Sequence, residues 1–264
     1  MTTPIKHQQD LITSLKIVQS LKDSCNIVSG DKYMQCNVNK NIALIIETPE
    51  EHKIDYDFTS LSLGKVLSSL NMFKNSELVF DEDHVCINRD IETKDVNMVF
   101  NNKQVETIPS PVNYNRPIQL DNFLKSRTSV IEFKLDSSQI KKLERSIKLF
   151  AYDYLKISRK GNNVFDNVII TPHHSNETHL EINTAPIKLD VTDINFTEDL
   201  DIIINNPLGF IYGDTSYTVK IHFNKSHNLK NLFNNDFSLV QFQWDKSDEL
   251  FTNKDFEMTY IAIL

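Results

Sequence analysis

The chain of 264 residues has a net charge of −8, and 40% of its residues are hydrophobic and 24% are charged. This composition excludes a disordered chain, and the length favours two domains of ordinary size. Only five glycines are present, which argues against the glycine-rich phosphate loops of nucleotide-binding enzymes.

The first residues, Met1–Asp10, are polar, and no segment approaches the roughly 20 apolar residues of a membrane span. The three cysteines, Cys25, Cys36 and Cys86, lack the spacing of metal ligands, so reduced thiols are the plain interpretation. We therefore expect a cytoplasmic protein without a secretory signal.

An amphipathic helix followed by strands is predicted near the N-terminus. The helix has its apolar residues on one face, at Leu11, Leu15, Val18 and Leu21. The segments Tyr33–Val38 and Ile42–Glu47 that follow are strand-like.

A gapless internal repeat follows. Ile54–Phe80 overlays Ile131–Ile157 at a constant offset of 77 residues, and nine apolar positions coincide. These positions alternate, then take helical spacing, then alternate again, which predicts a strand, a helix and a strand in each copy. Ser60 and Ser137 also coincide, just before each helix, where a hydroxyl can cap free backbone N–H groups.

The stretch Asn101–Arg116 has no sustained period and contains Pro109 and Pro111, which is typical of an extended linker. We therefore predict an N-terminal domain of residues 1–104, a connector of residues 105–118 and a C-terminal domain of residues 119–264. The C-terminal domain is expected to hold polar loops, strands and one short helix: loops at Thr171–Glu177 and Asn224–Asn235, strands at Leu200–Ile204, Tyr217–Phe223, Phe237–Trp244 and Glu257–Leu264, and the helix at Asn206–Tyr212.

Positive charge concentrates on helices of this acidic chain. The helix Ser137–Phe150 carries four basic residues and one acidic residue, a charge of +3, which leaves −11 for the rest. A solvated face is the ordinary interpretation of any one such helix, but three helices agree in sign. A common surface of these helices would suit phosphate without reading base sequence. The candidate DNA-facing residues are Lys6, Lys16, Lys65, Lys74, Lys141, Lys142, Arg145 and Lys148.

Three segments resemble the sliding clamps of tailed phages, which are relatives of proliferating-cell nuclear antigen (PCNA) and of the bacterial β clamp. Lys53–Ile87 resembles the second half of the first domain of these clamps, Leu200–Phe223 resembles the matching part of the second domain, and the terminal FEMTYIAIL resembles the closing strand. The proline-bearing linker stands where this family has its interdomain crossover.

The resemblance implies an α+β DNA-clamp fold of two similar domains, with helices on one side and antiparallel sheets outside. It further implies a homotrimeric ring that encircles duplex DNA, tethers the replicative polymerase as its processivity factor and is opened by an ATP-driven clamp loader, in the host cytoplasm if the protein is viral. Partner peptides would bind an apolar cleft, for which the candidates are Val105, Ile108, Val112, Tyr114, Tyr260 and Ile261.

Other chemistry is not favoured by the sequence. His173, His174, His179 and Glu181 cluster in a polar stretch without a standard zinc spacing, so we expect neither a metal nor another cofactor. Asp81–Asp83 is expected to be a hairpin turn rather than a pair of hydrolytic carboxylates. No catalytic arrangement is proposed, and a non-enzymatic protein is expected. The alternatives are a monomeric clamp-like polymerase accessory factor and a structural virion or scaffold protein built from duplicated α+β domains.

Overall fold

The computed structural model describes residues 8–21, 25–28, 32–36, 42–53, 58–60, 63–72, 77–80, 84–88, 96–101, 129–150, 154–159, 168–173, 187–189, 200–205, 211–223 and 237–263. The chain forms two compact units, each built of helix and antiparallel sheet. Unit 1 comprises residues 1–122 and 249–258, and unit 2 comprises residues 123–248 and 259–264. The predicted domain boundaries stay a prediction, because the connector lies outside the described residues.

Unit 1 contains two groups of antiparallel strands. The first group has the order β4-β1-β2-β3 and the second has the order β5-β6-β7. The strands are β1 (Cys25–Val28), β2 (Lys32–Cys36), β3 (Ile42–Glu47), β4 (Phe58–Ser60), β5 (Glu77–Phe80), β6 (His84–Asn88) and β7 (Val96–Asn101). The predicted strand Ile42–Glu47 is confirmed at both ends.

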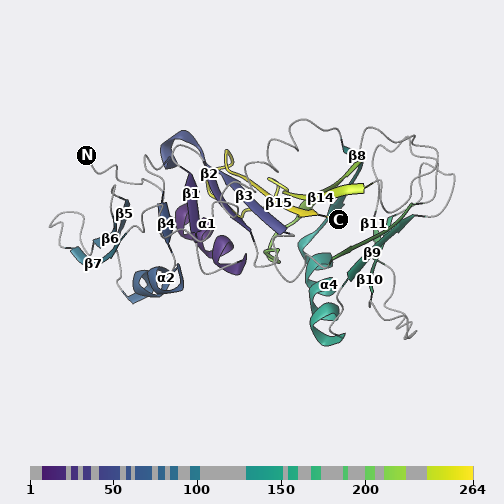
Figure 1. Ribbon diagram of the computed structural model, residues 1–264, viewed down its shortest axis with the longest axis horizontal. Coiled ribbons are helices and arrows are strands. Elements are labelled where there is room, and N and C mark those ends of the chain that lie inside the picture. The colour runs from purple at the N-terminus through teal and green to yellow at the C-terminus, as the bar shows by residue number, and fades with distance from the viewer. Residues whose placement is uncertain are drawn as a thin grey trace. The chain divides into compact units, whose positions relative to one another are not determined.

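The helices of unit 1 are α1 (Gln8–Leu21), α2 (Leu63–Met72) and the short 3₁₀-helix η1 (Glu50–His52). The predicted apolar stripe of α1 is confirmed, since all four of its members are at most 5% exposed. With this stripe α1 packs against β1, β2 and β3, and α2 lies beside it (Figure 1). Thus α1 covers the strands β1–β3, and α2 packs against α1.

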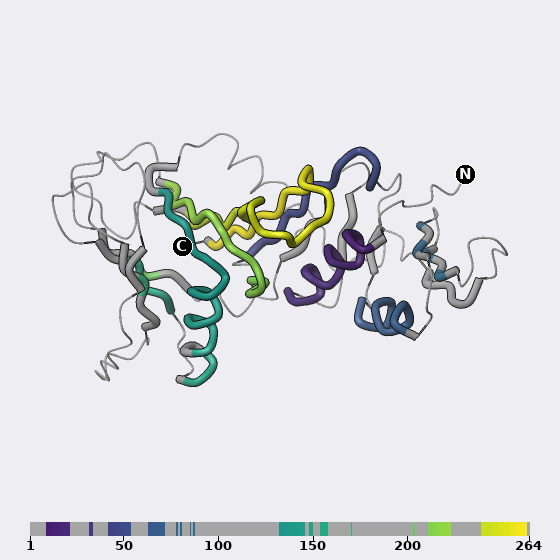
Figure 2. Tube along the Cα trace, turned by 180° about the vertical axis from the view of Figure 1, so that it is seen from behind, coloured from purple at the N-terminus to yellow at the C-terminus, as the bar shows by residue number. Residues whose placement is uncertain are grey.

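Unit 2 also contains two groups of antiparallel strands, in the orders β8-β13-β14-β15 and β12-β9-β10-β11. Figure 2 shows the green β13 beside the yellow β14 and β15. The strands are β8 (Ser129–Leu135), β9 (Tyr154–Arg159), β10 (Val168–His173), β11 (Ile187–Leu189), β12 (Leu200–Asn205), β13 (Tyr217–Phe223), β14 (Phe237–Trp244) and β15 (Glu257–Ile263). The helix α4 (Ser137–Phe150) follows β8 and contacts β10.

The helix and the second strand of the internal repeat predicted from the sequence are confirmed, whereas residues 54–57 of its first strand lie outside the described residues. One copy runs through β4, α2 and β5, and the other runs through β8, α4 and β9. The strands β5 and β9 begin at residues 77 and 154, which differ by the predicted offset. The matched positions whose side chains are described in both copies are all buried: Leu63 with Ile140, Val66 with Leu143, Leu78 with Leu155, and Phe80 with Ile157.

The four-stranded groups are built alike. Each joins three strands that are consecutive in the chain to a single strand at its edge. Thus β4 pairs with β1, β8 pairs with β13, and β12 pairs with β9. The first strand of each copy of the repeat therefore pairs with a strand outside both copies: β4 with β1, and β8 with β13.

Two local predictions need correction. Thr171–His173, expected in a polar loop, continue β10, where Thr171 pairs with Lys156 of β9. The strand begins at the apolar Val168–Ile170 and continues through Thr171–His173, because these residues also pair with the backbone of β9. Ile211 and Tyr212, expected at the end of a short helix, are not helical, and the rest of that segment lies outside the described residues. None of the helices that the structure describes combines the length and apolarity of a bilayer span.

Candidate nucleic-acid interface

The outer face of α4 carries the densest positive charge among the described helices. Lys141, Lys142, Arg145 and Lys148 are all exposed, whereas Ile140 and Leu143 on the opposite face are at most 2% exposed. A helix places residues three or four apart on one side, so a buried stripe forces these cations into solvent. The predicted exposure of this basic face is confirmed, and what it contacts is not tested.

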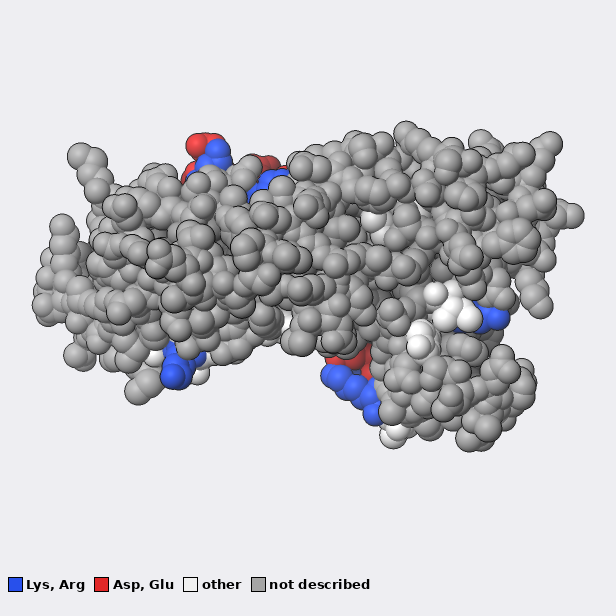
Figure 3. Space-filling view, in the orientation of Figure 1, with Lys and Arg blue, Asp and Glu red and all other residues white. Residues whose placement is uncertain are grey.

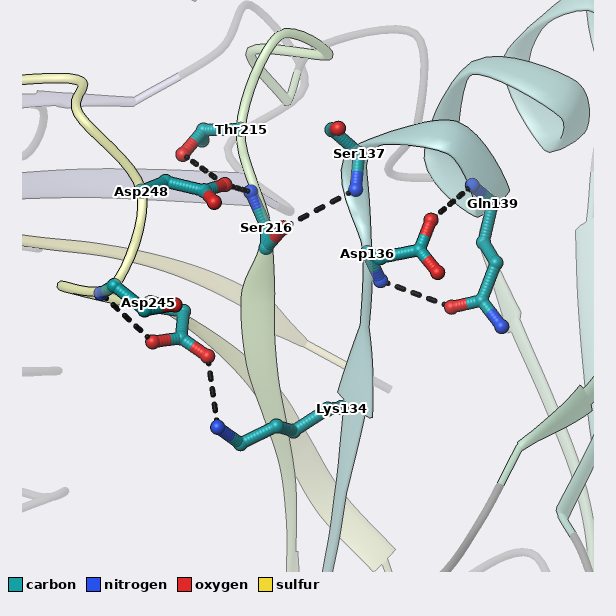
Figure 4. Close-up of polar contacts among 9 residues, drawn as sticks. Lys134, Asp136, Ser137, Gln139, Thr215, Ser216, Asp245 and Asp248 are labelled. Atoms are coloured by element: carbon teal, nitrogen blue, oxygen red, sulfur yellow. Dashed lines mark hydrogen bonds and ion pairs between the residues drawn. The ribbon is translucent and has the colours of Figure 1, made fainter.

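The start of α4 is fixed by a capping box (Figure 4). Asp136 Oδ1 accepts the backbone N–H of Gln139 at 2.8 Å, and Gln139 Oε1 accepts the backbone N–H of Asp136 at 2.9 Å. The hydroxyl of Ser138 also donates to Asp136 Oδ1, at 2.6 Å. These bonds satisfy N–H groups that the first turn of a helix leaves free.

The cap is therefore Asp136, not Ser137 as the sequence suggested. Ser137 is already the first helical residue, and its backbone N–H donates to Ser216 Oγ at 3.2 Å. Partial burial opposes ionisation of Asp136, but the hydrogen bonds from Ser138 and Gln139, with the nearby Lys142 cation, outweigh it and lower its pKa. The carboxylate that positions α4 is thus ionised at neutral pH.

Two acidic side chains lie against this basic face: Glu144 of the helix itself, and Asp214, whose position the sequence did not reveal. Lys141 Nζ is 2.8 Å from Asp214 Oδ1, and Lys148 forms an i,i+4 pair with Glu144. In the space-filling view, basic and acidic atoms lie directly against one another beside α4 (Figure 3). Asp214 is far from α4 in sequence, so helical periodicity carried no signal for it.

Among the described residues no acid forms an ion pair with Arg145. Two of the four cations are thus engaged by acids within unit 2, and a third, Lys142, acts electrostatically on Asp136. The field of α4 remains positive but is weaker than its sequence alone indicates.

In unit 1 the exposed faces of α1 and α2 carry few charges. Lys16 and Lys65 are exposed, and the other exposed residues described on these helices are uncharged. Asp10, which the sequence places on α1, is only 1% exposed, and its carboxylate accepts the backbone N–H groups of Thr252 and Asn253 at 2.7 and 3.0 Å. Because Asp10 is buried, it does not oppose Lys16 on the outer face.

Two of the predicted DNA-facing residues, Lys6 and Lys74, lie outside the described residues. So do Val105, Ile108, Val112 and Tyr114 of the predicted partner-peptide cleft. The other two, Tyr260 and Ile261, are fully buried within β15, and Tyr260 Oη accepts the backbone N–H of Tyr212 at 3.2 Å. The cleft therefore stays a prediction.

Metal-binding groups do not gather anywhere in the described ranges. His173 ends β10, while His174, His179 and Glu181 lie beyond the residues that the structure describes. The exposed lysines and arginine of the helices suit an anionic partner.

Comparisons of sequence found no matching family model. The sliding clamp of Vibrio phage KVP40 is 25% identical over 223 residues, which cover 83% of this chain and 90% of that protein. A chondroitin synthase of Pasteurella multocida is 22% identical over 222 residues, which cover 78% of this chain. This chain spans only 22% of the length of that synthase, so the match gives no account of the whole enzyme.

Comparisons of structure agree with the phage protein. PCNA from Entamoeba histolytica aligns with a TM-score of 0.55 at 11% identity, covering 99% of this chain and 97% of the other. A PCNA2–PCNA3 complex from Sulfolobus tokodaii aligns with a TM-score of 0.58 at 11% identity, covering 100% and 98%. The predicted α+β clamp fold is confirmed over the full length. Taken together, the match in sequence and this fold make the chain similar to a phage sliding clamp and to PCNA.

Proposed function

We propose that this chain is the subunit of a ring that encircles duplex DNA and tethers the replicative polymerase of a phage. The proposed ring has three subunits, is opened by an ATP-driven clamp loader and acts in the cytoplasm of the infected host. Its fold and its phage relative support a clamp rather than an enzyme. Its processivity would come from topology rather than from tight binding.

The observation that carries the proposal is the exposed cationic face of α4, together with Lys16 on α1 and Lys65 on α2. A tether that slides must avoid base-edge contacts, because each good one contributes about 1–3 kcal/mol and would hold it at one sequence. Contacts between lysine or arginine and phosphate are equivalent all along the duplex. We propose that these helical faces converge on the DNA.

The acidic remainder of the chain supports the same proposal. A net charge of −8 on the chain as a whole repels DNA from surfaces other than the basic ones. Partner proteins would then bind elsewhere. As their proposed site we retain the cleft between the connector and the C-terminal strand, with the candidates Val105, Ile108, Val112, Tyr114, Tyr260 and Ile261. Clients would insert apolar side chains there, because binding clefts are mostly apolar and contain only a few polar anchoring groups.

The ring is tested by measuring the mass of the intact chain by light scattering at micromolar concentration. The mass of a trimer is expected. A second assay loads the protein onto circular DNA: the closed circle should retain the protein, whereas a circle that has been cut to a linear molecule should release it. A protein that stays monomeric and dissociates equally from circular and linear DNA would instead favour the monomeric accessory factor.

The DNA-facing role is tested with the double charge reversal Lys142→Glu/Arg145→Glu. We expect the length of polymerase products to fall about twofold to tenfold near physiological salt, because two phosphate contacts are replaced by repulsion. The matched control is Lys246→Glu/Lys254→Glu, which makes the same change in net charge at exposed residues outside the helices. Equal loss in both variants, with unfolding transitions unchanged, would exclude a specific role for α4.

A further inference from the structure

The turn before β13 presents an acid to the basic face of α4. Asp214 Oδ1 lies 2.8 Å from Lys141 Nζ, and the two side chains are 64% and 47% exposed. A phosphate approaching Lys141 therefore meets the Asp214 carboxylate at the same place. The pair is open to solvent, so an incoming anion can compete for the cation.

The polypeptide on the N-terminal side of Asp214 is held in place. The backbone N–H of Tyr212 donates to Tyr260 Oη at 3.2 Å, and the hydroxyl of Tyr217 donates to the carbonyl of Tyr212 at 2.7 Å. Tyr217 and Tyr260 are fully buried and their rings contact each other edge to face. Two core tyrosines thus fix where the turn begins.

The C-terminal side of the turn is held as well. Asp248 Oδ2 accepts the hydroxyl of Thr215 at 3.1 Å and the backbone N–H of Ser216 (Figure 4). Thr215 is fully buried, and Ser216 Oγ accepts the backbone N–H of Ser137 at the start of α4. The backbone around Asp214 is therefore tied to the helix that carries Lys141.

This fixation distinguishes Asp214 from an ordinary surface acid. A mobile carboxylate would swing away when phosphate arrives, at little cost in free energy. A carboxylate on a fixed turn stays within reach of Lys141 and repels the phosphate throughout. We propose that Asp214 sets the DNA affinity of the α4 face by competing with phosphate for Lys141, an inference that rests on the proposed function. This competition would keep the contact between Lys141 and phosphate weak, as sliding along DNA requires.

The direct test is Asp214→Asn in the full chain, with binding to a short linear duplex followed by fluorescence anisotropy between 50 and 200 mM salt. We expect affinity to rise roughly threefold to fivefold at the low-salt end, and the slope of log affinity against log salt to steepen by about 0.9, the value for one more phosphate contact. The matched control is Asp255→Asn, the same substitution at an exposed residue of the loop between β14 and β15. It should leave the slope unchanged.

Lys141→Gln provides the second arm. In that background Asp214→Asn should gain almost nothing, because the cation for which phosphate competes is gone. An equal gain with and without Lys141, or an equal gain from Asp255→Asn, would overturn the inference and indicate a general charge effect.

The same assay separates this inference from the proposed function. If Lys142→Glu/Arg145→Glu weakens binding while Asp214→Asn does nothing, the inference fails and the proposed DNA-facing role of α4 stands. If the double reversal changes neither binding nor processivity, the proposed function of this face fails first, and the inference with it.

Discussion

The helices α2 and α4 occupy equivalent places in a repeated unit, yet only their buried faces are alike. Leu63 and Val66 of α2 match Ile140 and Leu143 of α4, and all four are at most 4% exposed. The exposed face of α2 holds one cation, Lys65, whereas that of α4 holds four. The core pattern is thus common to both copies, while the charge pattern belongs to one.

The surroundings of the two helices differ in the same sense. Around α4 the structure places a capping box at its start and the fixed turn with Asp214 at its side. Around α2 no acid among the described residues pairs with Lys65. The helix with more cations therefore also has more acids beside it. Counting basic residues along a helix overstates its attraction for phosphate, because neighbours from elsewhere in the chain set the local field.

The largest expected effect tests whether the buried faces are truly equivalent. Leu63→Ala and Ile140→Ala remove matched side chains that are 2% and 1% exposed. Each should lower the free energy of unfolding by about 2–5 kcal/mol, since a buried aliphatic side chain is lost and a cavity remains. Chemical denaturation of the two variants, followed by circular dichroism, measures both losses.

The surface variants Lys65→Ala and Lys142→Ala supply the control, with expected changes within about 0.5 kcal/mol. A loss below roughly 1 kcal/mol at only one of the two buried positions would break the comparison. It would mean that the corresponding helix can close over the missing side chain, and hence that the two copies are packed to different densities.

Much of this arrangement follows from the sequence by periodicity. The limits of β3, β13 and β14 coincide with the predicted strands, and β12 and β15 differ by one residue at one end. β13 alternates apolar and polar residues, whereas β3 is an almost unbroken apolar run, and short segments of either kind are typical of strands. The repeat was visible for the same reason, because buried positions tolerate few residue types and so preserve their spacing.

The rest depends on contacts between distant residues. Nothing in the sequence near α4 indicates that Asp214 lies beside Lys141, or that Asp10 is buried against Thr252. The cap was assigned to Ser137 because a serine also stands at the matching position, Ser60. The structure shows that Asp136, one residue earlier, reaches the N–H of the first turn instead. Local propensity allowed either residue to cap the helix.

The cap at Asp136 fixes the start of α4, and its loss should have an effect of intermediate size. Asp136→Ala should lower the free energy of unfolding by about 0.5–2 kcal/mol, as the loss of an N-cap does. Asp136→Asn should stay close to the parent at neutral pH, because an asparagine oxygen can accept the same N–H group. Denaturant unfolding at pH 7 measures both.

The two variants also differ from the parent in acid. The pKa of Asp136 is lower in the folded chain than its ordinary value of 3.8, so its contribution is fully present above that value. It is lost as the pH falls through the lowered folded pKa, because protonation removes the charge that the cap stabilises. Between about pH 5 and pH 2 the stability of Asp136→Asn should therefore fall less steeply than that of the parent. Identical slopes would show that this carboxylate does not stabilise the start of α4.

The smallest expected effect concerns the close approach of the turn to α4. A Cβ on Gly213 would lie 2.8 Å from Glu144 Oε2, so Gly213→Ala forces that carboxylate to move. The carboxylate ends a flexible side chain, and its i,i+4 pair with Lys148 contributes only about 0.2–0.5 kcal/mol. Replacing glycine also reduces the entropy of the unfolded chain, which stabilises by about 0.4–1 kcal/mol where the backbone permits. We therefore expect the two effects nearly to cancel, within about 0.5 kcal/mol by denaturant unfolding. A loss above roughly 2 kcal/mol would mean that Glu144 cannot yield to the added methyl group.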